Sequence, residues 1–162
     1  MIFYCPNCWS PVKEGEKTCH ECQADIEHLD HRSYFEKLLN ALDHPERATR
    51  IRAAHILGEL GDRRAVKAFA EVVDKIGGRE DVFLVEMVAL ALGKVDGEEA
   101  LPILSHLMEH PSFLVRRAAL NSLGRFKSGE ALAAIKKALP DPSPSVQELA
   151  RTILQTREKG MI

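Results

Sequence analysis

Four cysteines are the residues of this sequence whose type and spacing could do chemistry, and all lie within the first 22 residues: Cys5, Cys8, Cys19 and Cys22. They form two Cys-x2-Cys pairs separated by ten residues. Two such pairs can bring four thiolates to the corners of a tetrahedron, the closed geometry of a structural zinc site. We therefore predict that these cysteines bind zinc, with iron as the alternative metal because tetrahedral sulfur ligation suits both.

The segment that carries the cysteines is too short to fold on a hydrophobic core of its own. Chains below about 40 residues usually need disulfides, a bound metal or a partner chain to fold. Here metal binding would supply the folding free energy. Pro11 and Gly15 lie between the two pairs and predict a short hairpin there. The segment resembles the short zinc ribbons found at the start of many bacterial multidomain proteins. That family often has glycine after the second cysteine of each pair, where this sequence has Trp9 and Gln23.

A pattern of Leu-Gly pairs repeats through the rest of the sequence. The pairs stand at steps of 35 and then 31 residues: Leu57-Gly58, Leu92-Gly93 and Leu123-Gly124. A further step of 31 residues reaches Leu154-Gln155. A period in this range indicates a solenoid, in which each repeat is one supersecondary unit that must stack on its neighbours to bury its apolar face.

Each repeat is expected to hold two helices. The first helices are predicted at about 48–60, 82–95, 112–126 and 143–158. The second helices are predicted at about 65–76, 99–109 and 130–139, with an unpaired second helix at 33–42. In 33–42 the apolar residues recur every three or four positions, which is typical of one face of a helix.

The repeat pattern resembles the short HEAT-like repeats named after phycobilisome lyases. Leu-Gly closes the first helix, an acidic residue follows, and Ala-Val or Ala-Leu opens the second helix, over about Ser33 to Thr156. The resemblance implies an all-α fold: a right-handed α-solenoid of HEAT-like helical pairs, preceded by a small zinc-ribbon module. We expect a zinc ribbon at 1–24, a linker at 25–32 and the repeat solenoid at 33–162.

The function that this architecture favours is a non-catalytic scaffold or adaptor that binds another protein. In solenoids of this kind the second helices line the concave, binding face. The repeat offsets predict that Glu71, His106 and Lys137 project from it in a row. An acid, a neutral residue and a base suit a protein partner better than a polyanion. Trp9, a large aromatic residue beside the cysteines, is a further candidate contact for a partner.

Two enzyme classes of the wider repeat family are alternatives. Deoxyhypusine hydroxylase-like proteins hold two irons with His-Glu pairs, but the one His-Glu pair in this sequence is His20-Glu21, inside the ribbon. A role like that of the phycobilin lyases, or other handling of a small ligand, stays open, although residues 33–162 offer no cysteine for covalent attachment of a tetrapyrrole. We find no glycine-rich phosphate loop, nucleophile elbow or His-Glu-x-x-His motif in the sequence.

The charge pattern does not favour nucleic acid as a partner. The formal net charge is −2, so the cations are compensated, whereas phosphate binding needs several that are not. The arginines at the starts of first helices, such as Arg116, are expected to pair with a nearby acid, Asp43 or Glu109. No apolar run approaches the roughly 20 residues of a membrane span, and paired thiols of this kind indicate metal binding in a reducing compartment, so we expect the cytoplasm.

Overall fold

The computed structural model describes residues 3–76, 81–95 and 97–160 of the chain. The chain divides into two compact units, Met1–Ala53 and Ala54–Ile162, and each is described by itself. We call them unit 1 and unit 2. The boundary falls inside one helix, so unit 1 holds the cysteine-rich segment together with the first helical turns of the repeat region.

Unit 1 begins with a small antiparallel pair of strands, β1 (Phe3–Tyr4) and β2 (Pro11–Val12), in which Phe3 lies opposite Val12. The strands enclose the first cysteine pair, and an isolated bridge between Thr18 and Asp25 encloses the second. The hairpin predicted between the two pairs is therefore wrong in position. We call the Cys5–Cys8 and Cys19–Cys22 turns the first and second knuckle. Gly15 does form a turn, with φ at +76°, but this turn joins the two knuckles.

The remaining elements of unit 1 are α1 (Ile26–Asp30), α2 (Tyr34–Ala41) and the first turns of α3 (Arg47–Leu60). Helix α1 lies in the stretch expected to be a linker. Its five residues are started by the Asp25 side chain, which accepts a hydrogen bond from the His28 backbone N–H. Helix α2 confirms the predicted second helix and begins with a capping box between Ser33 and Glu36.

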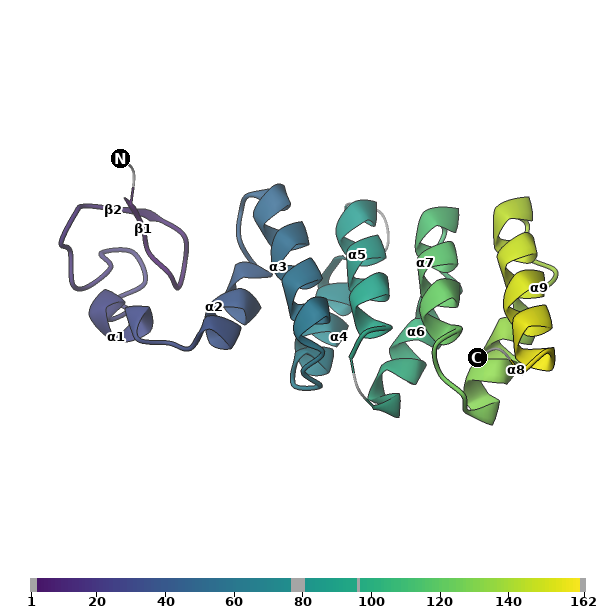
Figure 1. The fold of residues 1–162 in the computed structure, drawn as a ribbon. Coiled ribbons are helices and arrows are strands. Elements are labelled where there is room, and N and C mark those ends of the chain that lie inside the picture. The colour runs from purple at the N-terminus through teal and green to yellow at the C-terminus, as the bar shows by residue number, and fades with distance from the viewer. Residues whose placement is uncertain (1–2, 77–80, 96, 161–162) are drawn as a thin grey trace. The chain divides into compact units, whose positions relative to one another are not determined.

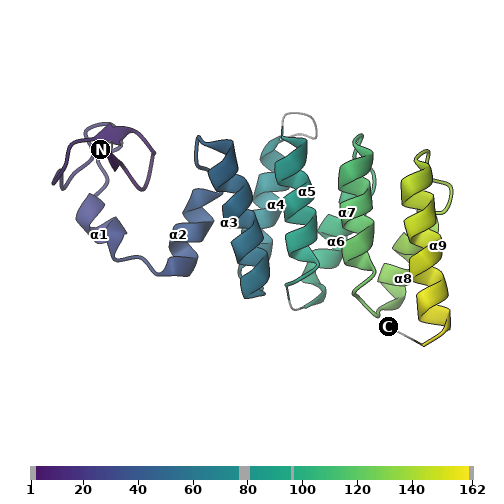
Figure 2. The same ribbon diagram turned by 45° about the horizontal axis from the view of Figure 1, so that its top comes forward.

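Unit 2 holds the rest of α3 and the stacked repeats. Its further elements are α4 (Ala65–Ile76), α5 (Val82–Leu92), the 3₁₀ turn η1 (Glu98–Ala100), α6 (Leu101–Leu107), α7 (Phe113–Leu123), α8 (Gly129–Lys137) and α9 (Pro144–Glu158). The first helices α5, α7 and α9 lie side by side in one layer, and the second helices α4, α6 and α8 form a second layer behind them (Figures 1 and 2). The all-α repeat solenoid expected from the sequence is confirmed.

The Leu-Gly pairs have a packing explanation. The leucines at the repeated position, Leu57, Leu92 and Leu123, are fully buried in the core of unit 2. The glycines let the next first helix come close: a Cβ built on Gly58 would lie 2.8 Å from the Ala91 Cα atom, and one on Gly93 would lie 2.9 Å from the Ser122 Cα atom. In each pair the leucine therefore fills the core, and the glycine allows the first helix of the next repeat to pack closely.

Helices α5 and α7 stop earlier than the sequence predicted. Their C-caps are Gly93 and Gly124, so the expected extensions to Val95 and Phe126 are wrong. The residues after each glycine form the turn that leads to the second helix. Helix α6 is also shorter than predicted, because its start is wound as the 3₁₀ turn η1.

Candidate metal centre and repeat surfaces

The four cysteine sulfurs converge in unit 1. The Sγ atoms of Cys5 and Cys22 lie 3.7 Å apart, as do those of Cys8 and Cys19, and all four atoms lie within 4.8 Å of one another. These separations are far longer than the roughly 2.05 Å of a disulfide, and all four cysteines are free thiols. Each close pair joins one knuckle to the other, so the arrangement brings both Cys-x2-Cys motifs to a single point.

The arrangement has the dimensions of a zinc site. A tetrahedron with metal–sulfur bonds of about 2.3 Å has sulfur–sulfur distances of about 3.8 Å, close to the 3.7 Å of the Cys5–Cys22 and Cys8–Cys19 pairs. Cys5 and Cys19 are fully buried, and Cys8 and Cys22 are half-buried. Four sulfurs would close the coordination sphere of zinc, which is typical of structural sites and leaves no position for a substrate.

The two knuckles have the same backbone geometry. The N–H of Trp9 donates to the carbonyl of Cys5 over 2.9 Å, and the N–H of Gln23 donates to the carbonyl of Cys19 over the same distance. Trp9 and Gln23 have φ of +62° and +59°, in the left-handed region that favours glycine. The positive φ expected at the glycine position of the ribbon family is therefore kept, although both positions carry side chains. Each such residue costs roughly 1–2 kcal/mol of strain, which metal binding can offset.

Neighbouring side chains favour the thiolate form of two cysteines. Ser10, with its Oγ 3.3 Å from Cys8 Sγ, lowers the pKa of that thiol to about 6. The Asn7 side-chain amide donates to Cys22 Sγ over 3.5 Å and lowers the pKa of Cys22. Burial raises the pKa of Cys5 to about 11. The thiolate is the form that binds metal, so the surroundings of Cys8 and Cys22 favour the form that a metal would need.

The first knuckle packs against the helical part of unit 1. The carbonyl of Pro6 accepts a hydrogen bond of 2.8 Å from Arg32 and another from the Asn40 side chain. The Trp9 ring meets the His44 ring edge to face, with centroids 4.4 Å apart. Trp9 is half-buried and engaged inside unit 1, and its predicted role as a partner contact stays a prediction.

The three residues predicted to form a row lie on three successive second helices. Glu71 lies on α4, His106 on α6 and Lys137 on α8, and all three side chains are exposed. His106 also lines a cavity of about 420 Å³ together with Val73, Asp74, Val85, Leu107, Glu109, His110 and Pro111. The sequence reasoning missed this cavity, because it forms where the ends of three helices meet.

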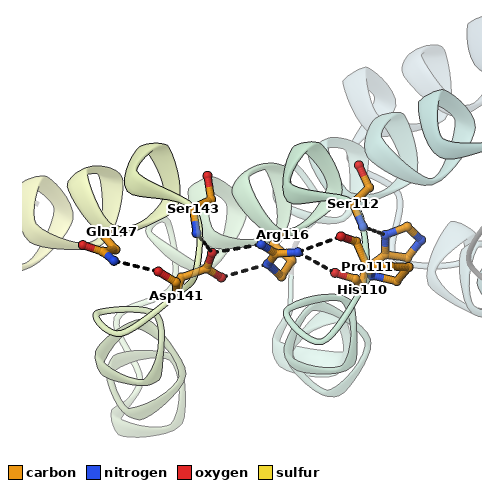
Figure 3. A network of polar contacts seen from close by, with 7 residues as sticks. All are labelled: His110, Pro111, Ser112, Arg116, Asp141, Ser143 and Gln147. Atoms are coloured by element: carbon orange, nitrogen blue, oxygen red, sulfur yellow. Dashed lines mark hydrogen bonds and ion pairs between the residues drawn. The ribbon is translucent and has the colours of Figure 1, made fainter.

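A polar network joins successive repeats near the starts of the first helices (Figure 3). Arg116 of α7 binds both carboxylate oxygens of Asp141, at 2.8 and 2.9 Å, and donates to the backbone carbonyls of His110 and Pro111. The expected pairing of this arginine with Asp43 or Glu109 is wrong. Its acid belongs to the next turn along the solenoid, where it is 25 residues away in sequence.

At the position equivalent to Arg116, the next repeat has Gln147, which makes a similar hydrogen bond. Gln147 stands 31 residues after Arg116 and donates to the backbone carbonyl of Asp141 over 2.7 Å, just as Arg116 donates to that of His110. The side chains of His110 and Asp141 in turn accept from backbone N–H groups two residues ahead, at 3.0 and 2.8 Å. Arg116 and Gln147 therefore fix one turn per repeat, and Arg116 also ties two turns together.

Two more contacts hold the opposite ends of the first helices. Lys94, after α5, forms an ion pair with Glu59 of α3 that lowers the pKa of the glutamate. Arg157 of α9 donates from Nη2 to the carbonyls of Leu123, Gly124 and Phe126 at the end of α7. Cations placed at helix C-termini interact favourably with the helix dipole, so these contacts reinforce the stacking.

The described residues hold no second candidate metal cluster and no helix suited to span a membrane. Apart from the four cysteines, no group of three or more His, Cys, Asp or Glu side chains within the described ranges lies close enough to share a metal ion. None of the helices in those ranges has the length and apolar character needed to cross a membrane.

Comparison with known proteins supports the repeat fold. A family model described as HEAT repeats matches residues 35–113 and 84–155. A solved structure of human deoxyhypusine hydroxylase in complex with glycerol is similar, with a TM-score of 0.64 and 25% sequence identity. That match covers 80% of this chain and 45% of the hydroxylase chain, so the present chain spans less than half of that protein's length. A search of curated proteins found no match. On the matches to the repeat model, which together run from residue 35 to 155, this chain belongs to the HEAT repeat family.

Proposed function

We propose that this protein is a non-catalytic scaffold or adaptor that binds another protein, and that unit 1 carries a structural zinc ion. The observation that supports the proposal is the exposure of three chemically different side chains on successive second helices, Glu71, His106 and Lys137. A row at one repeat spacing offers an extended partner a series of contacts of defined charge.

The zinc assignment rests on the closed geometry of the four sulfurs. Their separations fit zinc, and four protein ligands leave no position at which a metal could activate water or substrate. Zinc would be held by Cys5, Cys8, Cys19 and Cys22 and would supply folding free energy to the ribbon. Metal analysis of the purified protein should give one zinc per chain. A stoichiometric iron content would contradict this assignment and favour the alternative metal.

The likeness to deoxyhypusine hydroxylase supports the fold of the repeats without extending that protein's activity to this chain. The one His-Glu pair in the sequence lies at His20-Glu21, in the ribbon. Handling of a small ligand is the alternative function, and the cavity of about 420 Å³ beside His106 is the observation that favours it. That volume lies within the range of ligand pockets, about 300–1,000 Å³.

A pull-down from the protein's own cells tests the two functions against each other. We expect one protein to be retained in stoichiometric amount, and to be lost when Glu71→Lys and Lys137→Glu are combined. The matched control is Arg117→Glu with Glu148→Lys, which reverses two exposed charges on the first helices and keeps the same net charge. Recovery of a coloured or other small ligand without a protein partner would contradict the scaffold and support the alternative. In this proposal the protein works in the cytoplasm, where its thiols stay reduced.

A further inference from the structure

A groove between the last two helices of unit 2 combines an apolar floor with a basic rim. Its volume is about 460 Å³, comparable to known ligand pockets. It is lined by Lys127, Leu132, Lys136, Leu154, Arg157 and Glu158. We call it the C-terminal groove. Lys127 belongs to the turn after α7, and the other lining residues belong to α8 and α9.

The apolar floor is a core position that stays accessible. Leu154 is the fourth member of the leucine series whose earlier members, Leu57, Leu92 and Leu123, are fully buried. In α9 the same residue is only half-buried, and Leu132 beside it is half-buried as well. Exposed apolar surface within a concave site contributes binding free energy when a ligand covers it.

The rim is positively charged. Lys127 and Lys136 are exposed, and neither forms an ion pair with any described residue. Arg157 is held in place by its hydrogen bonds to the end of α7, all of which use Nη2. Its Nε and Nη1 donors can therefore serve a ligand. Against these three cations the lining has one carboxylate, that of Glu158, so the groove favours an anion.

The groove is not shaped to receive another helix pair. At the position where Gly58, Gly93 and Gly124 let the next first helix approach, α9 has Gln155, whose side chain is exposed. Arg157 stands where the preceding repeat has Phe126. A further repeat, or a second copy stacked in the same register, would have to bury these polar groups at a considerable cost in free energy.

We propose that the C-terminal groove binds a short acidic segment of a protein partner. One apolar side chain of that segment covers Leu132 and Leu154, and its flanking carboxylates bind Lys127, Lys136 and Arg157. Charge-assisted hydrogen bonds from a positioned arginine and two lysines to carboxylates account for the preference for acids. The proposal rests on the proposed scaffold function and adds to it the location and chemistry of one binding site.

The test uses the full chain with zinc bound and the labelled peptide acetyl-Glu-Asp-Leu-Asp-Glu, followed by fluorescence anisotropy. We expect saturable binding that weakens as salt rises from about 50 to 300 mM, because exposed charges are screened over this range. Replacing the leucine of the peptide by serine, or its acids by lysine, should weaken binding about tenfold or more. Lys136→Glu should weaken it by a similar factor, whereas Arg117→Glu, an equal change of charge on α7, should leave it unchanged.

Three results would overturn the proposal: absence of saturable binding, binding that Lys136→Glu does not weaken, and displacement of the peptide by an RNA decamer that binds more tightly. The last would assign the groove to nucleic acid. The pull-down separates this failure from failure of the scaffold. A partner that stays bound to the Lys136→Glu protein removes the groove proposal and leaves the scaffold standing. If the peptide binds in the groove but the pull-down captures no partner, the scaffold proposal is removed and the groove remains a peptide-binding site.

Discussion

The two units of this chain reach a defined fold by different physical means. The cysteine-rich part of unit 1 has few apolar residues and depends on four sulfurs that meet within 4.8 Å. Unit 2 has no cysteine and depends on stacked helices with leucines buried in a continuous core. The contrast sets a segment whose four converging sulfurs could bind a metal against a segment that folds on hydrophobic burial.

The two units also tolerate irregular backbone differently. The knuckles hold Trp9 and Gln23 at positive φ, a strain that a strongly bound metal can offset. In unit 2 the described residues at positive φ, Gly61, Gly97 and Gly160, are glycines, which carry little such strain. Gly58 and Gly93 are glycine for a different reason, because the neighbouring helix leaves no room for a Cβ. Removing the metal should therefore affect unit 1, and changing a glycine should affect unit 2. The single tryptophan reports on unit 1, and helical circular dichroism reports mainly on unit 2.

Removal of zinc should have the largest effect. Structural zinc contributes about 10–16 kcal/mol of apparent binding free energy in small modules, so chelation or Cys5→Ser should unfold the ribbon. We expect altered Trp9 fluorescence and loss of amide protection across the knuckles, while most of the circular dichroism at 222 nm is kept. Comparable loss of helical signal would show that unit 2 depends on the metal as well.

Breaking the Arg116–Asp141 pair should have the next largest effect, and it should be confined to unit 2. The two side chains are only 11% and 6% exposed, and removing one partner leaves a charge without compensation. Arg116→Ala should therefore lower the free energy of unfolding by about 3–5 kcal/mol. Urea denaturation followed at 222 nm measures this loss. The control Arg151→Ala removes an exposed ion pair with Glu148 and an exposed hydrogen bond to Gln147 Oε1, and it should cost less than about 1 kcal/mol.

A side chain at Gly93 should destabilise unit 2 by about 1–3 kcal/mol, typical of overpacking. The Cβ of Gly93→Ala would lie 2.4 Å from Ser122 Oγ, which donates to the carbonyl of Ala89 over 2.7 Å. Thermal unfolding should show a lower Tm. Gly129→Ala is the matched control, because nothing lies within 4 Å of a Cβ there, and it should leave Tm unchanged or slightly raised.

Acid should weaken unit 2 through Asp141. The hydrogen bonds from Arg116 hold the pKa of this carboxyl below its usual value of about 3.9. The resulting stabilisation is present above that value and is lost as the pH falls through the folded-state pKa. Asp141→Asn should make the free energy of unfolding less dependent on pH below about 4. A variant with the pH dependence of the parent protein would show that other carboxyls dominate acid unfolding.

The smallest expected effect is on zinc affinity, when the backbone strain at Gln23 of unit 1 is removed. Gln23→Gly removes left-handed strain of roughly 1–2 kcal/mol but loses the hydrogen bond of 3.0 Å from Nε2 to the His20 carbonyl. Its zinc affinity, measured by competition with a chelator, should equal or slightly exceed that of the parent protein. Gln23→Ala keeps the strain and loses the hydrogen bond, so it should bind zinc more weakly than Gln23→Gly. Equal affinities for both variants would show that the strain is negligible.

The sequence was most informative where a short-range pattern determines the structure. The Leu-Gly pairs predicted the repeats, although α5 and α7 end at the glycines and not beyond them, and the cysteine spacing predicted that four sulfurs would converge. It was less informative where the outcome depends on contacts across repeats. Arg116 pairs with Asp141 because stacking brings two turns together, and nearby Glu109 offered an equally reasonable partner from the sequence alone. Helix α1 was missed because a capping aspartate, and no apolar periodicity, starts it.

The stacking of unit 2 also has a consequence for the order in which the protein is made. Its inter-repeat contacts join residues about one repeat apart, such as Ser122 with Ala89 and Arg157 with Leu123. Each interface can therefore form as soon as the next repeat leaves the ribosome, without waiting for distant segments. Helix α7 packs against four helices, α5, α6, α8 and α9, so a substitution that disrupts α7 would separate the repeats before it from those after it.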